Sequence, residues 1–99
     1  MELVFAEGVL NEVLEAVEYF EGQSPGLGKS YLAHIEAGLD FIKRFPYASR
    51  VIRGEFRRLI IKRFPYGIIY RIDRDVLFIG AIGHLKRKPG YWADRIERP

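Results

Sequence analysis

The segment VLFIGAIG, residues 76–83, restricts the possible folds of this chain more than any other stretch. It contains no polar side chain, so apolar and polar residues do not alternate along it. A strand with this pattern is usually interior, with a neighbouring strand on each edge and cover on both faces. The remaining residues must therefore supply two neighbouring strands and the covering layers.

Two strands are expected directly before this segment. The first contains residues 59–61 and ends near Pro65, because proline has no N–H to donate to a central ladder. The second, residues 66–73, alternates cleanly, and the side chains on one of its faces are Tyr66, Ile68, Tyr70 and Ile72. Shorter strands are expected at residues 2–5 and 51–52.

Two amphipathic helices are predicted in the first half of the chain. The first covers residues 7–21, with an apolar stripe at helical spacing made of Val9, Leu10, Val13, Leu14, Val17 and Phe20. The second begins with Ser24 as N-cap and Pro25 at the first helical position, and Pro46 ends it near residue 45. Its expected stripe is Leu32, Ile35, Leu39 and Ile42, with Tyr31 and Phe45 at the margins.

These elements predict an α+β fold in a single domain, residues 1–99, with the order β-α-α-β-β-β-β. The last strand needs a second neighbour, and the first strand is the only free candidate. We therefore expect a mainly antiparallel sheet with strand order 1-5-4-3-2 and the helical hairpin packed on one face. The other face should carry Arg and Lys side chains and be open.

Composition excludes several classes of protein. With no cysteine, the chain has neither a disulfide framework nor a cysteine-ligated metal site, and we expect no metal or cofactor. It has no run of about 18 apolar residues that would span a membrane. Its first residues, MELVFAEG, lack the basic and apolar regions of a signal peptide. The lack of cysteine suits a reducing cytosol.

Charge is distributed unevenly along the chain. Residues 1–40 hold one base and eight acids (−7), whereas residues 41–99 hold fifteen bases and five acids (+10), which agrees with the net charge of +3. Such a division is typical of a protein whose basic half meets an anionic partner. The alternative is that acidic helices and a basic sheet compensate each other.

Three phrases carry a resemblance to a known family: YFEGQSPGLG (19–28), FPYGIIYRI (64–72) and HLKRKPGYW (84–92). Together they resemble the RelE/ParE superfamily of toxins from type II toxin–antitoxin, or plasmid stabilisation, modules. The resemblance covers nearly the whole chain. It implies a small cytoplasmic prokaryotic protein that arrests growth, encoded beside an antitoxin that neutralises it by tight binding.

The resemblance implies one of two activities, cleavage of messenger RNA on the ribosome or poisoning of DNA gyrase. If the protein is a nuclease, the expected catalytic residues are Arg58, His84, Arg87 and Tyr91. Arg58, Lys62 and Tyr91 fall at positions of the family's catalytic pattern, whereas Arg87 lies two residues beyond the position of the family's arginine. However, Gly67 and Leu85 stand where nuclease members have arginine. These departures favour gyrase over the ribosome. A third possibility is a family member that has lost its toxicity.

A wider set of residues is expected to bind the antitoxin or the target: Arg57, Arg58, Lys62, Lys86, Arg87 and Trp92. Gly67 should leave space beside them for a ligand. Structural roles remain open for the same residues. His84 can bond a backbone carbonyl, residues 86–88 can form a solvated basic turn, and Tyr91 with Trp92 can anchor the C-terminal turn on the sheet.

Overall fold

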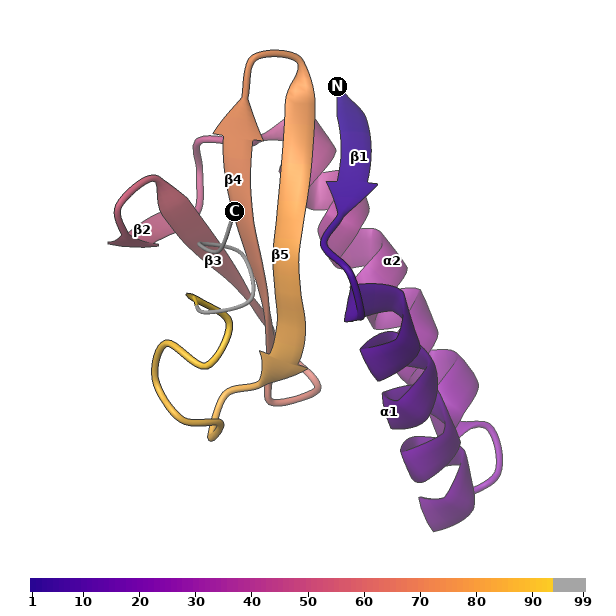
Figure 1. The fold of residues 1–99 in the computed structure, drawn as a ribbon. Helices are drawn as coiled ribbons and strands as arrows, with labels where there is room; N and C mark the ends of the chain where they lie inside the picture. Colours follow the sequence, from indigo (N-terminus) through magenta and orange to yellow (C-terminus); the bar gives the residue numbers. More distant parts are fainter. Residues whose placement is uncertain (94–99) are drawn as a thin grey trace.

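The computed structural model describes residues 1–93 and confirms the predicted architecture. A five-stranded sheet has the order β1-β5-β4-β3-β2, in which β1 runs parallel to β5 and the other pairs are antiparallel (Figure 1). The elements are β1 (Glu2–Phe5), α1 (Val9–Gln23), α2 (Leu27–Arg44), β2 (Arg50–Arg53), β3 (Phe56–Ile61), β4 (Tyr66–Asp73) and β5 (Val76–His84).

The interior strand β5 packs against a core on each face and contains a bulge. Ile79 pairs with Tyr70 and Ala81 pairs with Ile69, so Gly80 between them has no cross-strand partner. An inserted residue shifts the alternation of a strand by one position. Residues on both sides of the bulge therefore reach the helix-covered core, namely Leu77, Ile79 and Ile82.

The helix hairpin covers one face of the sheet, as expected, but two details of its apolar stripes were predicted wrongly. Leu10 and Leu14 are 55% and 58% exposed, whereas Val9 and Val13 are buried. One residue turns a helix by about 100°, so each leucine lies beside the buried stripe and not within it. Tyr31, expected at the margin, is fully buried.

The start of α2 also differs from the prediction of a Ser24 cap. The helix begins at Leu27 after Gly26, whose φ of 86° is in the left-handed region that favours glycine. The carboxylate of Glu21 in α1 accepts hydrogen bonds from the N–H groups of Gly26 (2.9 Å) and Gly28 (3.1 Å). A residue of the first helix therefore caps the second and fixes the hairpin.

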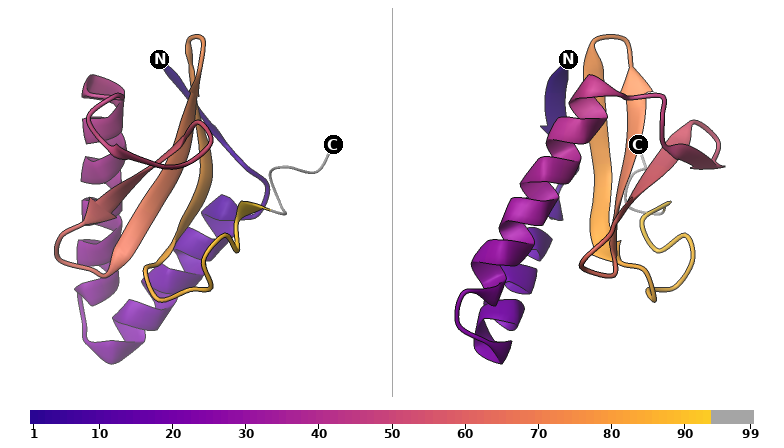
Figure 2. Two further views of the ribbon diagram at one scale, coloured as in Figure 1. Left: turned by 90° about the vertical axis from the view of Figure 1, so that its left-hand side faces the viewer. Right: turned by 180° about the vertical axis from the view of Figure 1, so that it is seen from behind.

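The second face of the sheet is covered in part, which corrects the expectation of an open surface. Residues 85–93 turn back across it, on the side opposite α2 (Figure 2). Trp92 is 3% exposed and its ring packs against that of Phe56, with centroids 4.9 Å apart. Ile69 and Ala81 lie in the same cluster. These contacts make a second, smaller core that the helices do not touch.

Within residues 1–93, neither α1 nor α2 is both long enough and apolar enough to cross a membrane.

Candidate functional site

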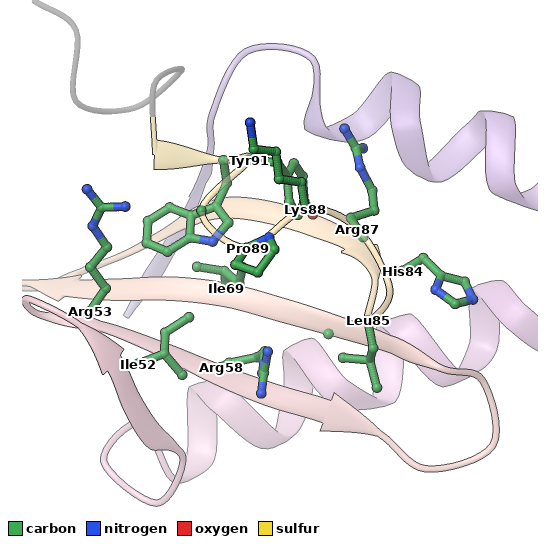
Figure 3. Close-up of a pocket in the computed structure, with 14 residues that line it drawn as sticks. Ile52, Arg53, Arg58, Ile69, His84, Leu85, Arg87, Lys88, Pro89 and Tyr91 are labelled. Carbon is green, nitrogen blue, oxygen red and sulfur yellow. The ribbon is translucent and has the colours of Figure 1, made fainter.

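A cavity of about 350 Å³ lies on the second face of the sheet, bounded by β3, β4, the end of β5 and residues 85–92 (Figure 3). We call it the basic cavity. Its described lining contains no Asp or Glu, and its charged or titratable residues are Arg53, Arg58, His84, Arg87, Lys88 and Tyr91. Within residues 1–93, His, Asp and Glu nowhere form a group of three that could hold a metal ion. The charged side chains of the cavity are therefore all basic.

Two glycines shape the floor of the basic cavity. Gly67 in β4 pairs with Gly83 in β5. A Cβ at Gly83 would overlap the hydroxyl of Tyr91, so the phenol rests directly on this backbone. A Cβ at Gly67 would lie 3.0 Å from Cδ of Arg58 and 3.3 Å from Cδ2 of Leu85. Gly67 therefore does not leave open space for a ligand, because the stem of Arg58 occupies it.

Arg87 joins the C-terminal segment to the first helix. Its Nη1 lies 3.4 Å from Oε2 of Glu12, and its guanidinium carbon lies 3.9 Å from the centroid of the Tyr91 ring. The side chain also borders a smaller recess of about 230 Å³ beside α1, on the other side from the basic cavity. Because the ion pair is exposed, it contributes only about 0–1 kcal/mol to stability. Its main effect is to fix the position of the guanidinium.

His84 lies at the rim of the basic cavity, but its ring faces the helix side of the sheet. It pairs with Tyr66 across the strands, and directly opposed residues point to the same face. The two ring centroids are 5.3 Å apart, and the imidazole points away from Arg58 (Figure 3). Its Nδ1 accepts a hydrogen bond from the backbone N–H of Lys86 at 3.0 Å. The structural alternative had expected a hydrogen bond from the ring to a backbone carbonyl.

That hydrogen bond determines which nitrogen of His84 carries the proton. A neutral imidazole has one N–H and one acceptor nitrogen, so with Nδ1 as acceptor the proton is on Nε2. The neutral ring then has no free lone pair to remove a proton from a substrate. Close by, burial raises the pKa of the Tyr66 hydroxyl, which therefore stays neutral at physiological pH.

The other predicted residues divide into two groups. Arg58, Arg87 and Tyr91 line the basic cavity, and His84 lies at its rim. The second group is Arg57, Lys62, Lys86 and Trp92. The first three lie outside the lining of the cavity, and Trp92 belongs to the lining but is buried. Lys62 and Lys86 are exposed elsewhere.

Arg57 and Trp92 have structural roles, of which the sequence indicated only that of Trp92. Nη1 of Arg57 donates hydrogen bonds to the carbonyl oxygens of Tyr47 (3.1 Å) and Ser49 (2.8 Å). Trp92 was expected to bind a partner, but its burial against Phe56 leaves almost no surface for one. Its indole therefore anchors the C-terminal segment, which was the alternative reading.

Sequence reasoning missed Arg53 and Glu12. Arg53, in β2, lines the basic cavity, and a Cβ at Gly90 would lie 3.1 Å from its Nη1. Glu12 lies in the first predicted helix, outside its apolar stripe. Its pairing with Arg87 joins residues 75 positions apart. No local pattern marks either residue, since both contacts depend on how the C-terminal segment folds back.

Comparison with known proteins identifies the family. The model of the ParE toxin of type II toxin-antitoxin system, parDE, matches residues 3–89. The chain belongs to the ParE toxin family. The prediction of a RelE/ParE-superfamily toxin is thereby confirmed, and family membership makes this ParE-family chain the toxin component of a type II system with a cognate antitoxin as partner.

A solved structure supports the same fold for this ParE-family toxin. It is described as the chromosomal ParDE TA system from P. aeruginosa, and its chain superposes with a TM-score of 0.63 at 13% sequence identity. The match covers 85% of this chain and 95% of that one. At this identity the likeness concerns the fold alone. A search of curated proteins finds no match.

Proposed function

We propose that this toxin arrests growth by poisoning DNA gyrase in the cytoplasm. The observation that carries the proposal is the position of the His84 imidazole, which faces away from the basic cavity and accepts the Lys86 N–H. Cleavage of RNA without a metal requires a base for the 2′-hydroxyl, cations for the phosphate and an acid for the leaving oxygen. The cavity supplies the cations, but the neutral His84 ring offers no free lone pair to act as the base.

The remaining lining residues do not replace the missing base. No described lining residue is a carboxylate, and the Tyr91 phenol rests on the backbone of Gly83. Arg87 is directed toward Glu12 and the Tyr91 ring. The two departures from the nuclease pattern point the same way, because Gly67 carries no side chain and Leu85 covers it with an apolar one. These features support action by binding a target over action by catalysis.

The proposal is tested with purified toxin, purified gyrase and relaxed plasmid in the presence of ATP. Gyrase poisoning should trap double-strand breaks, seen as linear plasmid after detergent and protease treatment. Plasmid incubated with toxin alone should remain intact. In cells, induction of the toxin should raise the SOS response before protein synthesis falls. Intact plasmid and an unchanged SOS response, in cells that stop growing, would refute gyrase as the target.

One observation favours the alternative, a ribosome-dependent mRNA endonuclease. The basic cavity has a cationic lining without a described acid, which suits the phosphodiester backbone of a nucleic acid. This reading requires the base to come from outside the toxin or from a rearranged His84. It predicts cuts at codon positions in ribosome-bound messages without DNA damage. Growth that continues under strong expression would instead identify a chain that has lost its toxicity.

A further inference from the structure

Exposed aromatic side chains gather where α2 ends and the chain leads into β2. We define the aromatic patch as Phe41, Phe45, Tyr47 and Val51, which are 40%, 51%, 68% and 45% exposed. Large apolar side chains scattered singly on a surface need no explanation, whereas clustered ones mark interaction sites. Three of the four aromatic side chains that are exposed in the described chain fall within residues 41–47. This surface is therefore a candidate contact site.

The members of the patch touch one another or a shared arginine. The rings of Phe41 and Phe45 have centroids 5.3 Å apart. The guanidinium carbon of Arg57 lies 5.3 Å from the centroid of Tyr47, and Arg57 is the cross-strand partner of Val51. Cross-strand partners lie about 5 Å apart on the same face of a sheet. The patch therefore continues from the end of α2 onto the edge strand β2.

The loop that carries the patch is held in place by the sheet. Arg57 donates to the carbonyls of Tyr47 and Ser49, and the Tyr70 hydroxyl donates to the carbonyl of Pro46 at 2.7 Å. Tyr70 is itself fully buried. Three hydrogen bonds thus fix a loop whose rings remain exposed. Apolar side chains on a fixed backbone lose little conformational entropy when a partner covers them, which is a property of strong binding sites.

Charge around the patch restricts what can cover it. Residues 41–57 contain five bases and a single acid, Glu55. Lys43, Arg44 and Arg50 are exposed beside the apolar rings, and Arg44 lies 5.8 Å from the Phe45 centroid. Such a surface fits a protein segment that alternates apolar and acidic side chains, since rings need apolar cover and the cations need carboxylates.

We propose that the aromatic patch docks an acidic, amphipathic segment of the cognate antitoxin. Membership of a toxin–antitoxin family supplies the partner, and the patch supplies the place and the chemistry. The proposal does not depend on whether the toxin acts on gyrase or on the ribosome. It places the antitoxin contact at residues 41–51, outside the basic cavity.

The test compares two double variants for binding to the purified product of the neighbouring open reading frame. Phe45→Ser with Tyr47→Ser removes two exposed rings of the patch. Leu10→Ser with Leu14→Ser is the matched control, because these leucines are equally exposed on α1. We expect the patch variant to bind about 100-fold more weakly, as two anchor residues would. The control should stay within about threefold of wild type.

A charge-reversal variant guards against a patch variant that fails to fold. Arg44→Glu with Arg50→Glu changes only exposed charges, so the variant should fold, with a loss of about 1 kcal/mol because Arg44 lies in the last turn of α2. It should weaken antitoxin binding and reduce its dependence on salt. The proposal is overturned if the patch variant and the charge variant bind like wild type, or if the α1 control loses as much affinity. It is also overturned if the patch variant keeps the antitoxin but loses growth arrest, because the patch would then contact the target.

Discussion

Gly83→Ala tests how the C-terminal segment is seated on the sheet. A Cβ at this position overlaps the Tyr91 hydroxyl and would lie 2.9 Å from the ring carbon that carries it. The ring is stiff and its neighbour Trp92 is buried, so the segment must shift as a unit. Overpacking of this kind costs about 1–3 kcal/mol, and the backbone restriction of alanine returns about 0.4–1 kcal/mol. The backbone at Gly83 does not have a positive φ, so alanine adds no strain there.

We therefore expect Gly83→Ala to destabilise the fold by about 1.5 kcal/mol. For a chain of 99 residues this corresponds to a melting temperature lower by about 10 °C. Gly67→Ala is the matched control on the paired strand. Its Cβ would meet only the flexible stem of Arg58 and the end of Leu85, so its stability should stay within about 0.5 kcal/mol of wild type.

A double-mutant cycle separates the contact from a general defect in β5. Tyr91→Phe removes the atom that the new Cβ overlaps, so Gly83→Ala should cost about 1 kcal/mol less in that background. The measurement is urea denaturation followed by circular dichroism, with the melting temperature as a second reading. Additive effects of the two substitutions, or a Gly83→Ala variant as stable as wild type, would refute the seating of Tyr91 on Gly83.

Three further substitutions probe single interactions. Tyr31→Phe should leave stability unchanged or raise it by about 1 kcal/mol, because its buried hydroxyl has no hydrogen-bond partner among residues 1–93. A clear loss of stability in urea titration would show that the hydroxyl has a partner. Burial raises the pKa of Tyr31 in the folded protein, so above about pH 10 the hydroxyl loses its proton in the unfolded chain before it does in the folded one. This difference lowers the stability of the wild type as the pH rises, and the loss at alkaline pH should be smaller in the Phe variant. Arg57→Ala should destabilise by about 2 kcal/mol through two lost bonds to carbonyls and increase proteolysis within residues 45–49, whereas unchanged cleavage would contradict its role in holding that loop. Glu12→Gln should change stability by less than about 1 kcal/mol, as thermal melting would show, since its bond to Arg87 is exposed.

Particular residues show why the fold was easier to predict than the site. The apolar segment at residues 76–83 required a central strand, and only residues 2–5 could provide its second neighbour. The same segment also required cover on both faces. Residues 85–93 supply the cover on the second face. The sequence did not predict this cover, because Lys86, Arg87 and Lys88 before Pro89 are typical of a solvated turn. Trp92 was the local signal for a buried anchor.

The geometry of the site depends on facts that no local pattern contains. The bulge at Gly80 changes which face each later residue of β5 occupies, and so places the His84 imidazole on the helix side. Strict alternation from Leu77 would have placed it on the face of Arg58. The pairing of Arg87 with Glu12 requires the final positions of a helix and a loop from opposite ends of the chain. Residue types at the site were thus predictable, and their directions were not.

The parallel pairing of β1 with β5 has a consequence for how the toxin is made. Glu2 pairs with Val76, so the edge strand has no partner until the ribosome has synthesised the central strand. At about 5–20 residues per second, the first strand and both helices wait for several seconds without a sheet to cover. Pairing between such distant segments also slows folding after release. A newly made chain therefore completes the basic cavity late, because the end of β5 and residues 85–92, which bound it, are synthesised after every other element.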